Sequence, residues 1–447
     1  MARNMTDGNP VKHIISFAFP LLLGNLFQQT YNIVDAAIVG RYLGPESLAA
    51  VGASSSVQFL VLGFCIGICA GFAIPVAQRF GAKEYKSMRG YVFNGAVLTA
   101  LIGAIVTLIC VILCTQILHI LLTPNDIFKN AYIYLVIIFA GIPFSLLYNY
   151  LSGILRAIGD SKTPFLFLAI SVALNIILDL FLIIVVKLGC AGAAIATIAA
   201  QGVSGLLCLI YIKRKIKLLH LSKKDCHFNG KYSVRLLVMG VPMGLQFSIT
   251  AIGSMVMQSA NNGLGSVYIS AFTAAMRIKQ LFMCPFDALA TAVSTFCSQN
   301  LGAGKIDRIK LGIRKGVMIG VLYGIFAGVI LIFSGRILSL MFVSSKAVAV
   351  LDASAKYLAC LGFFYWALGI LNVCRLCVQG IGYSGRAVLS GAVEMVARIF
   401  VSSVFVPIYG FNAICFADQA AWVMACMYIV PVCMWCVRKE QRNKKAV

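Results

Sequence analysis

The sequence predicts an all-α membrane protein with twelve transmembrane helices, and composition gives the first reason. Of the 447 residues, 61% are hydrophobic and only 11% are charged, and the mean hydropathy is +0.94. A soluble domain carries about 25% charged residues, so this composition excludes a water-soluble globular protein. Apolar segments also follow one another along the whole chain, each long enough to supply the roughly 20 residues that a helix needs to cross a bilayer.

Twelve apolar segments alternate with short polar stretches. They are residues 12–38, 48–78, 91–120, 131–152, 164–186, 191–212, 234–260, 266–299, 312–333, 353–377, 388–408 and 413–437. Most of the Lys and Arg residues lie in the termini and the even-numbered loops, so both termini are predicted to be cytoplasmic in a multi-pass protein of the plasma membrane. The net charge of +23 is therefore attributed to membrane orientation, and no nucleic-acid partner is expected.

The two halves of the chain resemble each other at an offset of about 221 residues, which indicates an internal duplication. QRFGA at 78–82 matches QNLGA at 299–303, and three glycine pairs follow the same offset: Gly44 with Gly265, Gly159 with Gly382, and Gly189 with Gly410. The basic stretch 213–235 separates two sets of six spans, which predicts an N-terminal six-helix lobe (1–222) and a C-terminal one (223–447). With an even number of spans each, the lobes share one orientation, so a pseudo-twofold axis along the membrane normal should relate them.

Polar residues recur along one face of the first span. Asn25, Gln28, Asn32 and Asp35 are spaced by three or four residues, and Tyr31 can lie on the same side. A charge at the bilayer centre costs several kcal/mol, so such a face should contact protein or water rather than lipid. Pro20 lies earlier in this span and is a candidate hinge, with a static kink as the alternative.

A second polar face occurs on the fifth span, where Asn175 and Asp179 are spaced i, i+4; Thr197 in the sixth span could add a hydroxyl. With Asp35, these residues form a candidate site for a proton or for Na⁺. Two neighbouring carboxylates resist being ionised together, so they can hold a proton or a shared cation. The alternative is a structural hydrogen-bond cluster.

The second half has a different polar pattern. Gln246 and Gln258 lie on the corresponding face of the seventh span and, with Asn25, Gln28, Tyr31 and Asn32, are candidates for lining a substrate cleft. The i, i+4 pair Glu394 and Arg398 favours an intramembrane ion pair over a transport site. Four other charged residues lie in or next to the predicted spans: Asp287 and Arg375 could line the cleft, while Asp418 and Arg277 could lie near span ends.

No enzymatic motif is present in the sequence. All four histidines lie at predicted span ends or in loops, away from any nucleophile motif, and there is no Walker loop or dinucleotide fingerprint. We therefore expect neither an enzyme nor a bound cofactor, and the ion that the chain would use is H⁺ or Na⁺.

Several stretches resemble the MATE (multidrug and toxic compound extrusion) family, over the full chain and in its DinF-like prokaryotic type. They are FPLLLGNLFQQTYNIVDAAIVGRYLG in the first span, LNIILDLFLI in the fifth, LSGILRAIGDSKTP before it, and AQRFGAKE and SQNLGAGK after the second and eighth spans. The resemblance implies twelve spans and antiport. It assigns Asp35, Asn175, Asp179 and, less directly, Thr197 to ion coupling, and Pro20 to helix bending.

The sequence departs from those family members that use carboxylates in the seventh and tenth spans. Gln258 lies near the first of these positions and no acid lies near the second, so coupling through the N-terminal lobe is expected. The predicted function is a monomeric efflux antiporter that exports organic, cationic or amphipathic compounds in exchange for inward H⁺ or Na⁺. Two alternatives are a flippase for a lipid-linked anionic headgroup and a non-transporting membrane receptor or scaffold.

Overall fold

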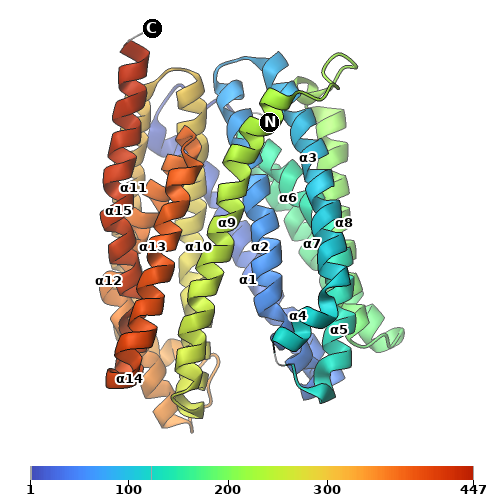
Figure 1. Cartoon of the computed structure of the whole chain (residues 1–447), viewed down its shortest axis with the longest axis vertical. Coiled ribbons are helices and arrows are strands. Elements are labelled where there is room, and N and C mark those ends of the chain that lie inside the picture. The colour runs from blue at the N-terminus through green and yellow to red at the C-terminus, as the bar shows by residue number, and fades with distance from the viewer. Residues whose placement is uncertain (1–2, 122, 446–447) are drawn as a thin grey trace. The chain divides into compact units, whose positions relative to one another are not determined.

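The computed structural model describes residues 3–121 and 123–445, and within them every regular element is a helix (Figure 1). The α-helices are α1 (Pro10–Leu43), α2 (Pro45–Gly81), α3 (Tyr85–Ile112), α4 (Cys114–Ile120), α5 (Asn125–Ala140), α6 (Ile142–Ala157), α7 (Lys162–Leu180), α8 (Cys190–Lys215), α9 (Gly230–Asn262), α10 (Ser266–Gly302), α11 (Ile306–Ser339), α12 (Val348–Ile381), α13 (Ser384–Phe400), α14 (Val406–Tyr409) and α15 (Phe411–Lys445). Two five-residue π-helical segments, η1 (Phe181–Val185) and η3 (Val401–Phe405), and a short 3-10 turn, η2 (Lys217–Leu219), complete the set.

The predicted twelve spans are confirmed. Eleven helical segments are long and apolar enough to cross a membrane, and α5 with α6 forms a twelfth span that bends by 44°. The bend has a local cause, because Pro143 in the first turn of α6 has no N–H to continue the hydrogen-bond ladder of α5. The chain is therefore a multi-pass membrane protein.

Two span predictions need correction. The segment 91–120 is not one helix, because α3 ends at Ile112, Leu113 leaves the helical conformation (φ −88°, ψ 5°), and α4 begins at Cys114. The segment 131–152 is the bent pair and extends over 125–157. Apolar residues lie on both sides of each break, so a hydrophobicity pattern alone does not reveal them.

The chain divides into two compact units, and two helices contribute to both. The first unit contains Leu23–Gly244 with residues 3 and 4, and the second contains Met5–Leu22 with the chain from Leu245 onward. The change of unit in α1 lies two residues after Pro20, and the change in α9 lies two residues after Pro242. The lobe boundary after residue 222 stays a prediction based on chain order, and the terminal residues 1, 2, 446 and 447 lie outside the described part.

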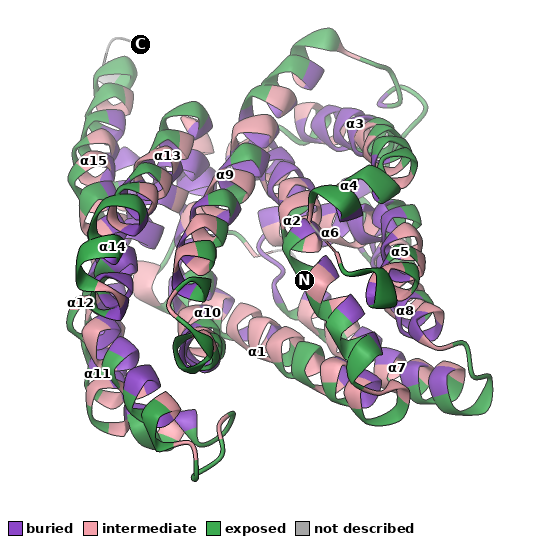
Figure 2. Cartoon of the chain, turned by 60° about the horizontal axis from the view of Figure 1, so that its bottom comes forward, coloured by how far each residue is buried: buried purple, intermediate pink, exposed green. Residues whose placement is uncertain are grey.

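Large apolar side chains face outward from the helices of each unit, as a lipid environment requires. Phe333 is 81% exposed, and Leu108, Val185 and Ile337 are also exposed. Buried residues lie on the helix faces that contact neighbouring helices within each unit, and exposed ones lie on the opposite faces (Figure 2). This pattern inverts the usual polar exterior of a soluble protein.

In the first unit, glycines bring α2 and the first half of α9 into backbone contact. A Cβ added at Gly71 would lie 2.5 Å from Gly240 Cα, and one added at Gly67 would lie 2.7 Å from Gly244 Cα. In lipid there is no hydrophobic drive between helices, so such close van der Waals packing between small residues supplies much of the association energy.

In the second unit, three glycines at four-residue spacing line the contact between α11 and α12. Gly320 packs on Gly369, Gly324 on the backbone of Trp366, and Gly328 on Gly362. The repeated G-x-x-x-G spacing places all three on one face of α11.

The duplication predicted from sequence is visible in the backbone. All six glycines of the three pairs have positive φ: 85° and 106° for the first pair, 87° and 111° for the second, and 60° and 56° for the third. The π-helical segments η1 and η3 are also separated by the repeat offset. Both halves therefore repeat the same turns and the same helix irregularity.

The stretch between α8 and α9 is held to the first unit by polar contacts. Asp225 accepts hydrogen bonds from the amide and hydroxyl of Ser222 and pairs with Arg89 of α3 at 2.9 Å. The Ser222 hydrogen bonds, followed by Arg89, lower the pKa of the Asp225 carboxyl below its usual value. The Asn94 side chain of α3 binds the backbone N–H of Asn229 at 2.8 Å.

We expect Gly324→Leu to destabilise the second unit, because the new side chain would start 2.6 Å from Trp366 Cα. Overpacking of this kind costs about 1–3 kcal/mol. Thermal unfolding of the purified protein in detergent measures the effect as a lower Tm. Val329→Leu on the exposed face of α11 is the control and should leave Tm unchanged; equal Tm values for both variants would contradict the tight α11–α12 contact.

Candidate functional site

Two carboxyl groups from distant parts of the chain meet inside the first unit. Asp35 of α1 and Asp179 of α7 lie within hydrogen-bonding distance of each other. Asp35 is 8% exposed and Asp179 is fully buried. The Oδ1 atom of each is buried and has no hydrogen-bond partner among the described residues. The sequence placed these acids on two polar helix faces, and the structure brings those faces together.

An amide and two hydroxyls surround the pair. With the Asn175 amide oriented to satisfy both its groups, its nitrogen donates to Asp179 Oδ2 at 2.9 Å and its oxygen accepts the Thr197 backbone N–H at 3.1 Å. The Thr197 hydroxyl lies 2.9 Å from the Tyr31 hydroxyl. All four predicted coupling residues therefore lie in one cluster, together with Tyr31 from the predicted cleft set.

Sequence reasoning missed two members of this cluster. Tyr134 of α5 is 5% exposed, interacts electrostatically with both aspartates, and is hydrogen-bonded to Gln58 of α2. Tyr134 lies in an apolar span without a charged residue within four positions, so it does not stand out as the aspartates do. Gln58 was detectable as a polar residue within a long apolar segment.

The surroundings of the pair are apolar and irregular. Val39 and Ala193 belong to a small buried cluster that also includes Tyr134. The helix changes from α to π geometry at Phe181, two residues after Asp179. Such π segments commonly occur at functional sites, because they turn side chains away from regular helix positions.

The chemistry of this cluster suits a proton or a hard cation. Its donor atoms are oxygens from carboxylate, amide and hydroxyl groups, which are typical ligands for hard cations such as Na⁺. Within the described residues no group of three or more His, Cys, Asp or Glu side chains is arranged to hold a metal ion. Two carboxyls in contact inside a bundle can also share one proton.

The remaining predicted cleft residues lie outside this cluster. Asn32 is exposed on α1, while Asn25 and Gln28 are half-buried. In the second unit, Gln246 accepts a hydrogen bond from Gln379 at 2.6 Å and Gln258 donates to Asn262 at 2.9 Å. Their assignment to a substrate surface stays a prediction.

The second unit contains a buried network of alternating charges. Asp418 of α15 binds Lys279 of α10, Arg398 at 2.9 Å and the Tyr357 hydroxyl at 2.8 Å. Arg398 also pairs with Glu394 at 3.3 Å, as the i, i+4 spacing predicted. Glu394 in turn pairs with Arg375 of α12. All five charged side chains are at least nine-tenths buried.

This network corrects two interpretations. Asp418 does not simply lie at a span end, because its side chain is 1% exposed and it is the centre of three interactions. Arg375 is buried against Glu394 and the Ser390 hydroxyl. Lys279 was missed altogether, although a lysine within an apolar segment is a recognisable signal.

The clusters of the two units occupy equivalent places in the repeat. At the offset of about 221 residues, Thr197 corresponds to Asp418 and Gln58 to Lys279, and Tyr134 corresponds to Tyr357 with a shift of two residues. The first cluster contains only acids and neutral groups, whereas the second pairs each acid with cations. Duplication has thus produced one site with unpaired acids and one site in which both acids are paired with cations.

A polar face runs along α10 in the second unit. Between Ala271 and Gly302 every exposed residue of this helix is polar, namely Thr273, Arg277, Gln280 and Asp287. The Asp287 carboxylate has no hydrogen-bond or ion-pair partner within the described residues. The positive charge of Arg375 interacts with it electrostatically without direct contact. Because exposed charges within a span avoid hydrocarbon, this face should contact water.

These features define a duplicated helical membrane protein with an acidic polar site inside one unit. The chain belongs to the MatE family, whose model matches residues 20–181 and again residues 242–404, once in each repeat.

Relatives and solved structures agree with this assignment. The chain is 33% identical over 385 residues to the probable multidrug resistance protein YpnP of Bacillus subtilis, and the match covers 85% of each protein. It is 24% identical to the multidrug export protein MepA of Staphylococcus haemolyticus, over 88% of this chain and 87% of that protein. A MATE crystallised in complex with MaL6 and an outward-facing multidrug resistance MATE transporter each superpose with a TM-score of 0.92 at 21% identity over 98% of both chains.

We expect Asp418→Asn to lower stability sharply, because it would leave Lys279 and Arg398 without their shared buried counter-charge. Removing one partner of a buried ion pair costs about 3–5 kcal/mol. The Tm in detergent is the measurement, and Asp352→Asn in a surface ion pair is the matched control. If the two variants lost stability equally, the buried network would not be a structural element.

Proposed function

We propose that the chain is a multidrug efflux antiporter that exports organic, cationic or amphipathic compounds while H⁺ or Na⁺ moves inward. The observation that supports this most directly is the contact between Asp35 and Asp179, two carboxyls buried without a cationic side chain in their cluster. Family membership and the relatives named as multidrug resistance and export proteins support the class of cargo.

Coupling follows from the charge state of this pair. When both aspartates are ionised, their negative charge attracts a cationic compound, and the apolar and aromatic surroundings suit its hydrophobic body. A proton or Na⁺ bound at the pair removes that attraction. Cargo and ion therefore favour different charge states, and this difference in affinity can shift the protein between two conformations.

Helix bending would connect the site to conformational change. Pro20 and Pro242 each lie two residues before the point where α1 or α9 passes from one unit to the other. A proline inside a helix removes one backbone hydrogen bond and permits a kink. We assign Pro20 as a hinge and Pro242 as its repeat equivalent, with both termini at the cytoplasmic face of the plasma membrane.

The exposed face of α10 provides a second carboxylate for cargo. Asp287 is the acid on this face, and its side chain is available to a ligand because Arg375, the cation that interacts with it electrostatically, is itself paired with Glu394. We assign Asp287 to recognition of the cationic group of the cargo rather than to ion coupling.

We expect Asp35→Asn to insert and fold but to abolish ion-driven efflux, because the pair can no longer exchange its charge. The measurement is export of a fluorescent organic cation from proteoliposomes under a pure pH gradient and then under a pure Na⁺ gradient. Asp126→Asn, an exposed position at the start of α5, is the control and should transport normally. Undiminished transport by Asp35→Asn would refute coupling through the pair, and an absence of wild-type transport under both gradients would favour a non-transporting receptor or scaffold.

We expect Asp287→Asn to weaken equilibrium binding of a monovalent organic cation by about tenfold, the loss of one charge-assisted interaction. Binding of an uncharged compound should not change. Fluorescence titration of purified protein measures both affinities, with Asp307→Asn, whose side chain is 89% exposed, as the control. Equal losses for charged and uncharged compounds would indicate a structural role instead.

A further inference from the structure

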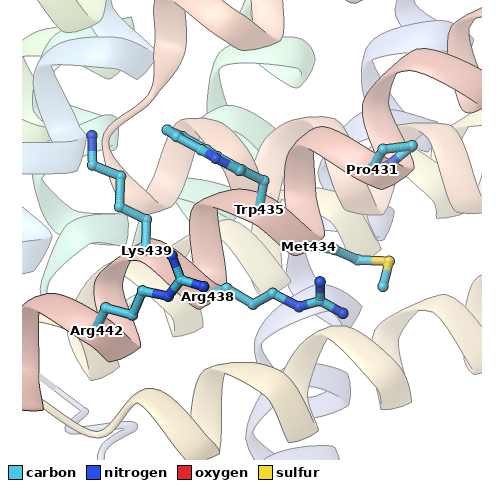
Figure 3. A pocket seen from close by; sticks show the side chains of 6 residues that line it. All are labelled: Pro431, Met434, Trp435, Arg438, Lys439 and Arg442. Atoms are coloured by element: carbon cyan, nitrogen blue, oxygen red, sulfur yellow. The ribbon is translucent and has the colours of Figure 1, made fainter.

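The C-terminal end of α15 has a concave basic surface that transport does not explain. It is a hollow of about 500 Å³ lined by six residues of one helix face: Pro431, Met434, Trp435, Arg438, Lys439 and Arg442 (Figure 3). The first three residues are apolar or aromatic and the last three are cationic. The hollow is therefore amphipathic along the axis of α15, and no carboxylate is among the residues that line it.

The axial spacing of these residues matches the depth profile of a bilayer. A helix rises 1.5 Å per residue, so Arg438 lies about 4–5 Å and Arg442 about 10 Å beyond Trp435. The polar headgroup layer is about 5–8 Å thick on each side of the hydrocarbon core. Because Trp residues favour the boundary of these layers, Arg438 and Lys439 begin within the headgroup region and Arg442 begins at its outer side, while Met434 and Pro431 lie toward the acyl chains.

Aromatic and cationic contacts hold Trp435 in place within the second unit. The guanidinium of Arg386 lies 3.8 Å from the centroid of its ring, and Lys439 Nζ lies 5.0 Å from it. The Tyr383 ring packs edge-on against it at 5.9 Å. Trp435 nevertheless stays 40% exposed and Met434 is 51% exposed, so an apolar surface remains next to the cations.

The nearby acid is already engaged. Glu440 accepts a hydrogen bond from the Tyr383 hydroxyl at 2.6 Å and does not line the hollow. Arg438, Lys439 and Arg442 therefore present positive charge without a neutralising carboxylate at the surface of the hollow. The phosphate group of an anionic lipid attracts such a cluster of basic residues.

We propose that this hollow binds an anionic phospholipid, with the headgroup phosphate on Arg438, Lys439 and Arg442 and an acyl chain along Met434 and Pro431. Basic residues at a span end are common as an orientation signal. The hollow differs from such a signal because the cations surround a concave surface with an immobilised aromatic ring and an exposed apolar floor. This ligand is a membrane component and not cargo, so the proposal is independent of the proposed antiport.

Native mass spectrometry of the full-length protein in detergent tests the proposal. Wild type, Arg438→Gln/Arg442→Gln and Lys223→Gln/Lys224→Gln are each incubated with equal amounts of phosphatidylglycerol and phosphatidylcholine. Both variants lose two positive charges, but Lys223 and Lys224 lie in the exposed loop before α9. We expect wild type and the loop variant to retain phosphatidylglycerol preferentially, and the α15 variant to lose this preference by about tenfold.

Two further arms separate the sources of binding. Trp435→Leu keeps every charge, so loss of the preference for phosphatidylglycerol in this variant would assign binding to the shaped hollow. An unchanged preference would mean that general electrostatic attraction explains the binding, and it would overturn the proposal. Inorganic phosphate at millimolar concentration should not displace the lipid; displacement would assign the hollow to a free anion. An equal loss of the preference for phosphatidylglycerol in the loop variant, or no such preference in the wild type, would also refute the proposal.

Discussion

The structure depends on one constraint: two carboxyl groups lie side by side inside a helical bundle, and no cationic side chain of the described residues pairs with them. Like charges in a poorly solvated site repel strongly, so the pair needs a shared proton, a bound cation or a positively charged cargo. The hydrogen bond from Asn175 to Asp179 and the contact of Thr197 with Tyr31 hold the helices that present this pair. The unpartnered Oδ1 atoms leave the pair able to accept another ligand.

Duplication gave the two units the same turns and helix irregularities, but the buried acids are unpaired in the first unit and paired with cations in the second. Where the first unit has Thr197 and Gln58, the second has Asp418 and Lys279, which are joined in an ion pair. A network in which both buried acids are paired favours one arrangement of helices, because separating its members leaves unpaired buried charges. The aspartate pair of the first unit can thus change its charge by binding a proton or a cation, whereas the ion-pair network of the second unit keeps its charges.

Much of this organisation could be predicted from the sequence, because a membrane span must be apolar and any charged residue within it stands out. Hydropathy gave the twelve spans, and the cost of intramembrane charge identified Asp35, Asp179 and the Glu394–Arg398 pair. Hydropathy could not locate the breaks at Leu113 and Gly141, because apolar residues lie on both sides of each break. Tyr134, which is an uncharged residue within a largely apolar span, is identified as part of the site only by the packing between helices.

The pairing across helices was also beyond the sequence. Helical spacing places Asp418 on a face of α15, but only packing shows that Lys279 and Arg398 reach it. Glycines at four-residue spacing are visible in the chain, yet their partners on α12 are not. Periodicity identifies which residues share a face, whereas three-dimensional packing decides which faces meet.

The most direct measurement is the number of ions released when cargo binds to the purified protein at equilibrium, without a membrane gradient. A weakly buffered indicator solution reports protons, and a competition titration with NaCl reports Na⁺. The account predicts that binding of an organic cation releases a proton or is weakened by Na⁺, and that Asp179→Asn abolishes the effect. Cargo affinity independent of both pH and Na⁺ in the wild-type protein would contradict it.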